Sequence, residues 1–336
     1  MLNYKVILFV LGQLLFLEAI MLAACCGVGF IYHENTLIDF GIPTLICISL
    51  GLLFHFLGGS KNQGMGRRDA FLIVSTTWLL FSIIGMLPFL LSGIVTRPSV
   101  AFFETMSGFT TTGATALNGI DALPHSILFW RSLTHWVGGV GIVFFTIAIM
   151  PNADASEQKM FTAESTGLKI GKLHPRVRST ARWIGGLYVF LTLACIVSLY
   201  LGGMDTFDAI NHGLSTMATG GFSTHQDSIA FFHSARIENI LMVFMTLASL
   251  NFTLLYLGLF KKHWKDMWKD DELRVFLGIV LTIALIGMLV LYFRDHRTLA
   301  DAARLSFFHT ISIQSTTGFT TEDFMNWDPS TWVFVA

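Results

Sequence analysis

Three short polar segments carry a residue pattern that could bind a cation. Each contains a Thr-Gly pair within a run rich in hydroxyl-bearing residues. Glycine has no Cβ, so the chain can adopt unusual backbone angles there and turn its carbonyl oxygens to one side. At membrane depth, such oxygens can replace the water molecules around a cation. The candidate ligands are the main-chain carbonyls of Thr111, Thr112, Gly113, Ala218, Thr219, Gly220, Thr316, Thr317 and Gly318.

Each polar segment follows an apolar stretch that is too short to cross a membrane. The stretches 102–109, 207–217 and 303–314 predict short helices (half-helices), whereas a spanning helix needs about 20 mostly apolar residues. The negative end of each half-helix dipole would face the ion path. One Thr-Gly pair alone would indicate an ordinary turn. Three pairs, with glycines separated by 107 and 98 positions, predict a repeat protein built around a pore.

The composition indicates an integral membrane protein. Of the 336 residues, 53% are hydrophobic and 13% are charged, whereas ordinary soluble domains carry about 25% charged residues. The net charge of −1 gives no indication of a nucleic-acid partner. The cysteines lie in apolar runs without metal-ligand or disulfide spacing, and we expect them to be core side chains. They are Cys25, Cys26, Cys47 and Cys195.

The apolar segments predict an all-α integral membrane protein, in which an N-terminal helical hairpin precedes repeated units of helix, half-helix, filter loop and helix. The predicted spans are 7–32, 37–57, 71–94, 127–150, 184–201, 237–260 and 275–293, and the segment from Trp332 resembles the start of another. The predicted domains are a transmembrane hairpin 1–66, pore repeat one 67–152, a cytoplasmic linker 153–180, pore repeat two 181–262 and an incomplete pore repeat three 263–336. A fourth repeat is absent from the sequence, so we expect it to be part of a longer chain.

The distribution of Lys and Arg predicts the orientation in the membrane. One side carries 15 of these residues and the other carries 6, so the N-terminus is expected in the cytoplasm and the half-helices are expected to enter from outside. The outer side also carries 13 acidic residues, among them Asp227, Glu322 and Asp323 near the filter loops. These acids either form a negative vestibule that concentrates cations or only reflect the shortage of bases in outer loops.

Five other polar side chains lie in or beside the apolar segments. We expect His212 and His309 to orient or pack the filter rather than to bind a metal. Glu104 holds the corresponding place in copy one, and either biases the electric field or accepts hydrogen bonds from filter amides. Arg131 is interpreted as a snorkelling arginine in preference to a functional charge, and His135 as a core histidine. An enzyme that uses His135, His212 and Glu104 is disfavoured, because the sequence lacks paired carboxylates, a nucleophile elbow and metal-ligand spacing.

The basic segments 151–182 and 261–274 allow two interpretations. They are either solvated faces or a docking surface for a cytoplasmic regulatory partner. The residues that would contact such a partner are Lys169, Lys172, Arg176 and Arg178.

The sequences TTTGAT, MATGGFST and STTGFTT resemble the successive filter loops of the TrkH/KtrB/HKT superfamily of potassium transporters. The N-terminal hairpin and the linker sequences AEST and HPRVRST are similar to the TrkH family of bacterial Trk systems. The resemblance implies four repeats with pseudo-fourfold symmetry around one pore, and a homodimer in the bacterial inner membrane. It also implies gating by a cytoplasmic nucleotide-binding subunit of the TrkA type. The fourth filter and an intramembrane gate would lie beyond Ala336.

The predicted function is potassium uptake through a K⁺-selective pore, with K⁺ as the transported ion and no organic cofactor. The resemblance gives Gly113 a role in K⁺ selectivity, because a serine at this position in plant relatives accompanies sodium transport. A symporter that couples K⁺ to H⁺ or Na⁺ on the same architecture is the alternative. The expected partners are the regulatory subunit, a second copy of the chain and membrane lipid.

Overall fold

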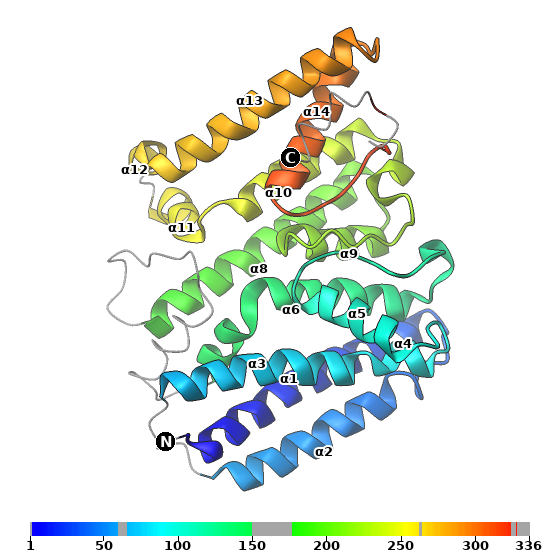
Figure 1. The fold of residues 1–336 in the computed structure, drawn as a ribbon, viewed down its shortest axis with the longest axis vertical. Helices are drawn as coiled ribbons and strands as arrows, with labels where there is room; N and C mark the ends of the chain where they lie inside the picture. Colours follow the sequence, from blue (N-terminus) through cyan, green and yellow to red (C-terminus); the bar gives the residue numbers. More distant parts are fainter. Residues whose placement is uncertain (1, 60–65, 150–176, 262–263, 324–326, 328–336) are drawn as a thin grey trace. The chain divides into compact units, whose positions relative to one another are not determined.

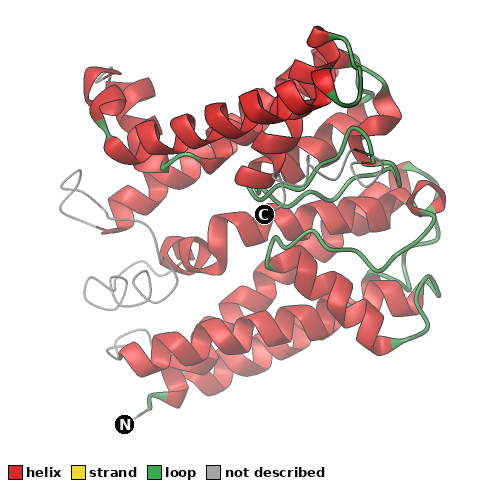
Figure 2. Ribbon diagram, turned by 45° about the horizontal axis from the view of Figure 1, so that its top comes forward, coloured by secondary structure: helices red, strands yellow, loops and turns green. Residues whose placement is uncertain are grey.

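The computed structural model describes residues 2–59, 66–149, 177–261, 264–323 and 327, and every regular element in these residues is a helix (Figure 2). The chain divides into two compact units, Met1–Gly186 and Leu187–Ala336. Five helices of the described part are long and apolar enough to cross a membrane, which agrees with the expected all-α fold. Most of the predicted linker, including Lys169, Lys172 and Arg176, lies outside the described residues, as does the segment from Trp332.

Helix α1 (Tyr4–Ile31) is the centre of the first unit. It pairs with α2 (Gly41–Gly58) in the N-terminal hairpin and also packs on α3 (Arg67–Gly85) and α6 (His125–Ile149) (Figure 1). At 1.5 Å per residue α1 is about 42 Å long, which exceeds the hydrocarbon core of about 30 Å. Glu34, in the loop after α1, accepts a bond from the main-chain N–H of His125 at 2.5 Å and one from the following residue at 3.1 Å. The hairpin therefore caps the start of α6.

Helix α5 (Pro98–Phe109) is the half-helix of copy one, and it packs on both α3 and α6. Proline at its first position favours a helix start, because the missing N–H would have had no partner there. A Cβ on Gly138 of α6 would overlap the main-chain carbonyl of Phe109, so glycine permits this close approach. Trp130 of α6 donates its indole N–H to the carbonyl of Gly85 in α3 at 3.0 Å. The connecting elements are α4 (Leu87–Leu91) and η1 (Ile120–Ala122).

The second unit contains the half-helices of copies two and three, α9 (Thr206–Met217) and α14 (Leu299–Gln314). Asp205 and Thr298 cap them, each by accepting a bond from the main-chain N–H three residues later. Helix α14 packs on α13 (Asp271–Phe293). The other elements are α8 (Val177–Gly202), which begins in the first unit and includes Arg178, η2 (Ser228–Phe232), α10 (Ala235–Ser249), α11 (Phe252–Lys261) and α12 (Trp264–Lys269).

All three half-helices end at the predicted residues, Phe109, Met217 and Gln314. They begin earlier than the apolar pattern predicted. The reason is that Pro98, Asp205 and Thr298 are start signals that lie upstream of the apolar residues.

Two predicted spans are not continuous helices. The span 127–150 is interrupted at Gly141, whose backbone is non-helical (φ 74°, ψ 135°). The span 237–260 is divided between α10 and α11 by Leu250, which is extended (φ −77°, ψ 153°). Asn251, whose carbonyl accepts the N–H of Leu255, then starts the new helix. Average hydropathy does not detect these breaks, and it also missed α12 within the predicted loop 261–274.

Candidate cation-binding segments

The three half-helices end in the same backbone motif. In copy one, Thr111 lies in the left-handed region (φ 54°) and its N–H donates to the carbonyl of Gly108 at 3.0 Å. The N–H of Thr112 donates to the carbonyl of Ser107 at 2.9 Å. Together these bonds form a Schellman motif, which usually has glycine at the left-handed position. The same bonds run from Thr219 and Gly220 to Thr216 and Ser215, at 3.0 Å each, and from Thr316 and Thr317 to Ile313 and Ser312, at 2.9 Å each.

The backbone angles identify which glycine of copy two matches those of the other copies. Two residues after each left-handed threonine, a glycine again has a positive φ: Gly113 at 73°, Gly221 at 80° and Gly318 at 80°. The predicted glycine, Gly220, does not have a positive φ. It lies between the two left-handed residues, so Gly221 is the counterpart of Gly113 and Gly318.

By position in this backbone motif, the residues of copy two lie one place later than the predicted ligands. Ala218 is the C-cap of α9, the position that Thr110 and Ser315 hold in the other half-helices. The residues of copy two that correspond to 111–113 and 316–318 are 219–221. The sequence MATGG contains two adjacent glycines, and only the backbone angles distinguish them.

The sign of φ alternates within each of the filter segments, which we define as residues 110–115, 218–223 and 315–320. It is positive at the threonine and at the glycine, and negative at the residue between them. Successive carbonyls of an extended strand point in opposite directions, whereas alternation of left-handed and right-handed residues lets them point the same way. Hydroxyl pairs at 2.8 Å support two of the segments, between Thr110 and Thr112 and between Ser315 and Thr317. Each segment can thus present a short row of carbonyl oxygens.

The filter segments of copies two and three lie against each other in the second unit. A Cβ on Gly221 would overlap the carbonyl oxygen of Thr317. The N–H groups of Ile229 and Ala230, which follow the second segment, both donate to the carbonyl of Thr320, at 3.0 and 3.1 Å. Glycine at position 221 is therefore required by this contact as well as by its φ. Copy one belongs to the first unit, and its closeness to the other copies stays a prediction.

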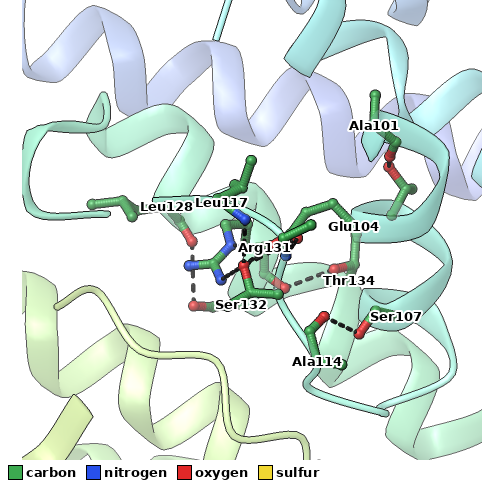
Figure 3. Close-up of polar contacts among 12 residues, drawn as sticks. Ala101, Glu104, Ser107, Ala114, Leu117, Leu128, Arg131, Ser132 and Thr134 are labelled. Atoms are coloured by element: carbon green, nitrogen blue, oxygen red, sulfur yellow. Dashed lines mark hydrogen bonds and ion pairs between the residues drawn. The ribbon is translucent and has the colours of Figure 1, made fainter. Parts of the chain in front are cut away.

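A buried ion pair holds the residues that follow the first filter glycine (Figure 3). Arg131 Nε donates to Glu104 Oε1 at 2.9 Å, and the two side chains are 2% and 0% exposed. Glu104 also accepts bonds from the Thr115 hydroxyl at 2.9 Å and from the Ala116 N–H at 3.0 Å. The interpretation of Arg131 as a snorkelling arginine is wrong, because α6 turns this side chain inward against Glu104. Glu104 accepts a main-chain hydrogen bond beside the filter, as one of its two interpretations predicted.

His212 and His309 occupy the place of Glu104 in the other copies. His212 Nδ1 lies 2.9 Å from the carbonyl of Asp208, and Nε2 lies 2.9 Å from the hydroxyl of Ser223. Because a carbonyl only accepts, Nδ1 of the neutral ring carries the proton and Nε2 accepts from Ser223. His309 Nδ1 makes the same kind of bond within its own helix, at 2.9 Å. His212 therefore orients the exit of the second filter segment, as predicted.

The acids near the filter segments are partly paired. Glu322 accepts a bond from Arg297 at 2.9 Å and one from the indole of Trp327 at 3.0 Å. Asp208 lies 3.0 Å from His225 Nε2. Because Arg297 compensates the charge of Glu322, fewer negative charges are available than the sequence suggested, and the vestibule stays a prediction. Among the described residues, no group of three or more His, Cys, Asp or Glu could hold a metal ion.

A serine that was not predicted to matter lies six residues before each filter glycine. These serines are buried, and they are Ser107, Ser215 and Ser312. When the three copies are aligned on Gly113, Gly220 and Gly318, the serine of copy two is out of register by one position. The three serines align only when Gly221 replaces Gly220 in this alignment.

Comparison with known proteins shows which family the chain belongs to. The TrkH family model, described as a cation transport protein, matches residues 38–336. The Trk system potassium uptake protein TrkH of Escherichia coli (strain K12) is 35% identical over 331 residues, which cover 97% of this chain and 68% of that protein. Its counterpart in Vibrio parahaemolyticus is 36% identical with the same coverage. The Trk system potassium uptake protein TrkG of Escherichia coli (strain K12) is 33% identical and covers 99% of this chain.

A solved structure is similar over the same extent. The crystal structure of the potassium transporter TrkH from Vibrio parahaemolyticus matches with a TM-score of 0.86 at 35% identity, and the match covers 99% of this chain and 69% of that one. Because these relatives are transporters, the expectation that the chain is not an enzyme is confirmed. The chain belongs to the TrkH family of cation transport proteins and is a multi-pass membrane protein.

Proposed function

We propose that this protein takes up potassium through a K⁺-selective pore, and that main-chain carbonyls of residues 111–113, 219–221 and 316–318 bind the ion. One observation carries the proposal. The same backbone motif, with the same alternation of φ, closes three half-helices whose side chains differ. A geometry that is kept while the side chains change favours a function of the main chain rather than of particular side chains.

The chemistry of the motif suits a monovalent cation. Carbonyl oxygens are dipoles without net charge, so they can replace the hydration shell of K⁺ and still release the ion. Each segment also follows the C-terminal end of a half-helix, where the backbone dipole contributes about half a negative charge. The names of the relatives support K⁺ as the ion, since they are potassium uptake proteins.

The orientation and the partners complete the proposal. The excess of Lys and Arg on one side supports a cytoplasmic N-terminus, in a bacterial inner membrane, with half-helices that enter from outside. A homodimer and a cytoplasmic nucleotide-binding subunit would assemble with the chain, and the subunit would dock on the basic segment 151–182. The names of the relatives as parts of a Trk system support such an assembly.

The test compares two glycines that share the same backbone strain. Gly318 and Gly93 both have a positive φ, of 80° and 72°, and a Cβ on either would meet no atom within 4 Å. The protein is produced in a bacterial strain without its own potassium uptake systems, and the uptake of Rb⁺ and Na⁺ is measured. We expect Gly318→Ser to lower the Rb⁺/Na⁺ ratio and Gly93→Ser, which lies outside the filter segments, to leave it unchanged. Equal ratios in the unaltered protein, Gly318→Ser and Gly113→Ser would refute the filter.

A further inference from the structure

The buried serines of copies one and three each contact their filter segment twice. In copy one, the hydroxyl of Ser107 donates to the carbonyl of Ala114, the residue after the filter glycine, at 2.6 Å (Figure 3). The carbonyl of Ser107 accepts the N–H of Thr112, the residue before the glycine, at 2.9 Å. One residue thus holds the chain on both sides of Gly113.

Copy three repeats both contacts. The hydroxyl of Ser312 donates to the carbonyl of Phe319 at 2.7 Å, and its carbonyl accepts the N–H of Thr317 at 2.9 Å. In copy two, the carbonyl of Ser215 accepts the N–H of Gly220 at 3.0 Å, and its side chain is fully buried. The serine contacts therefore follow the register set by Gly221.

These bonds fix the directions of the carbonyls on either side of the glycine. In a trans peptide the C=O and the N–H point in opposite directions. Because the N–H of Thr112 points at Ser107, the carbonyl of Thr111 points away from the half-helix. The hydroxyl of Ser107 does the reverse at Ala114, whose carbonyl it turns back toward the half-helix. The row of outward carbonyls therefore ends before residue 114, and in copy three it ends before residue 319 by the same argument.

Two other buried hydroxyls of the half-helices bond within their own helix. Thr105 donates to the carbonyl of Ala101 at 2.8 Å, and Thr216 donates to the carbonyl of His212 at 2.6 Å. Both are bonds to the preceding turn of the same helix, which is the usual partner of such a hydroxyl. Ser107 and Ser312 instead reach across to the filter segment, so their bonds are specific to that contact.

We propose that Ser107, Ser312 and, by its position, Ser215 are positioning residues that end the row of ion-facing carbonyls and so help to set ion selectivity. Without the hydroxyl, the carbonyl of Ala114 or Phe319 loses its donor and can turn toward the ion path. A carbonyl that is no longer held in place can close in on the smaller Na⁺, whereas carbonyls at fixed positions fit K⁺. The proposal rests on the filter proposed above.

The test measures Rb⁺ and Na⁺ uptake in Ser107→Ala and Ser312→Ala in the same bacterial strain. Removal of one buried hydrogen bond corresponds to a change of roughly fivefold, and we expect the Rb⁺/Na⁺ ratio to fall by about this factor. The matched control is Thr105→Val, which removes a buried hydroxyl from the same half-helix without a filter contact, and it should keep the original ratio. Ser107→Cys retains a weak donor of similar size and should give an intermediate ratio. The ratio does not depend on the amount of protein, so a merely structural loss would not change it.

The outcomes separate this inference from the proposed function. An unchanged ratio in both serine variants, together with a lowered ratio in Gly318→Ser, would overturn the role of the serines and leave the filter intact. An unchanged ratio in Gly318→Ser and Gly113→Ser as well would overturn the filter itself. An equal fall in the Rb⁺/Na⁺ ratio of Thr105→Val would also contradict the inference. The loss of a buried hydroxyl without a filter contact would then be enough to lower the ratio. If Ser107→Ala does not reach the membrane, Ser312→Ala and Ser107→Cys decide the question by the same criteria.

Discussion

A threonine with a positive φ is unfavourable, because its branched Cβ crowds the backbone in the left-handed region. Thr111, Thr219 and Thr316 all adopt this conformation, at φ of 54°, 53° and 59°. Strain of this kind costs roughly 1–3 kcal/mol per residue and is concentrated at functional sites. Glycine would relieve it and is the usual residue of this helix-ending motif. A threonine in all three copies therefore indicates that the side chain, which is stiff at χ1, is needed to hold the segment.

We predict that glycine in place of one of these threonines raises stability and lowers selectivity. Thr316→Gly should raise the free energy of unfolding by about 1 kcal/mol, because the relief of strain exceeds the entropic cost of glycine. It should also lower the Rb⁺/Na⁺ uptake ratio, because the segment becomes more mobile. Thermal unfolding of the purified protein and uptake in cells measure the two effects. His33→Gly is the control, since His33 also has a positive φ (58°) but lies between α1 and α2, and its ratio should not change. A less stable Thr316→Gly with an unchanged ratio would contradict the argument.

At the residue scale, the repeated Thr-Gly pairs marked the three segments that share one backbone motif, since a polar run between apolar stretches is visible in composition. They did not show how the residues of the three copies align. The pair Gly220-Gly221 could not be resolved, because both glycines satisfy the pattern and only one has a positive φ. Arg131 was misjudged for a related reason. Hydropathy does not show which side of a helix faces inward, and Glu104 is 27 positions away.

At the scale of elements, the bond between Arg131 and Glu104 joins half-helix α5 to the return helix α6. Both side chains are removed from water, so their attraction must offset a large desolvation cost. The same carboxylate receives the Thr115 hydroxyl and the Ala116 N–H. Any movement of α6 relative to α5 would therefore disturb the residues just after the filter glycine.

We predict that Arg131→Met destabilises the protein by about 3–5 kcal/mol, since it leaves Glu104 buried without a counter-ion. The double variant Arg131→Met with Glu104→Gln should recover part of this loss, because the uncompensated charge is removed. Thermal unfolding of the two single variants and the double variant forms a cycle that isolates the coupling between the residues. Additive effects of the two substitutions would show that the pair is not coupled and that α5 is held to α6 by apolar packing alone.

The lengths of the elements were predictable where local signals agree with hydropathy. The half-helices end at the expected residues because a polar run follows each apolar stretch. The interruptions at Gly141 and Leu250 were not predicted, because both lie inside apolar runs whose average hydropathy is uniform. Asn251 is a residue type that favours the start of a new helix, and it is the local signal in the sequence for the second break.

At the scale of the molecule, the repeated unit constrains how the chain can be arranged. The second and third filter segments touch through main-chain atoms at Gly221 and Thr317. The first segment has the same backbone motif but lies in the other compact unit. The distribution of Lys and Arg predicts the same direction in the membrane for all three copies. In the proposed pore, all three half-helices therefore enter the membrane from the same side.

Cysteine labelling tests this common orientation. We expect Asn118→Cys, from the first unit, and Asp227→Cys, from the second, to react in spheroplasts with a thiol reagent that does not cross the membrane, because both exposed residues follow a filter segment. Lys269→Cys, on the basic side, should react only after permeabilisation. If Lys269→Cys alone reacts in spheroplasts, the orientation is the reverse of the predicted one, and the common direction of the three copies still holds. Reaction of Asn118→Cys and Asp227→Cys from opposite sides would contradict the common orientation, because the distribution of Lys and Arg places both positions outside.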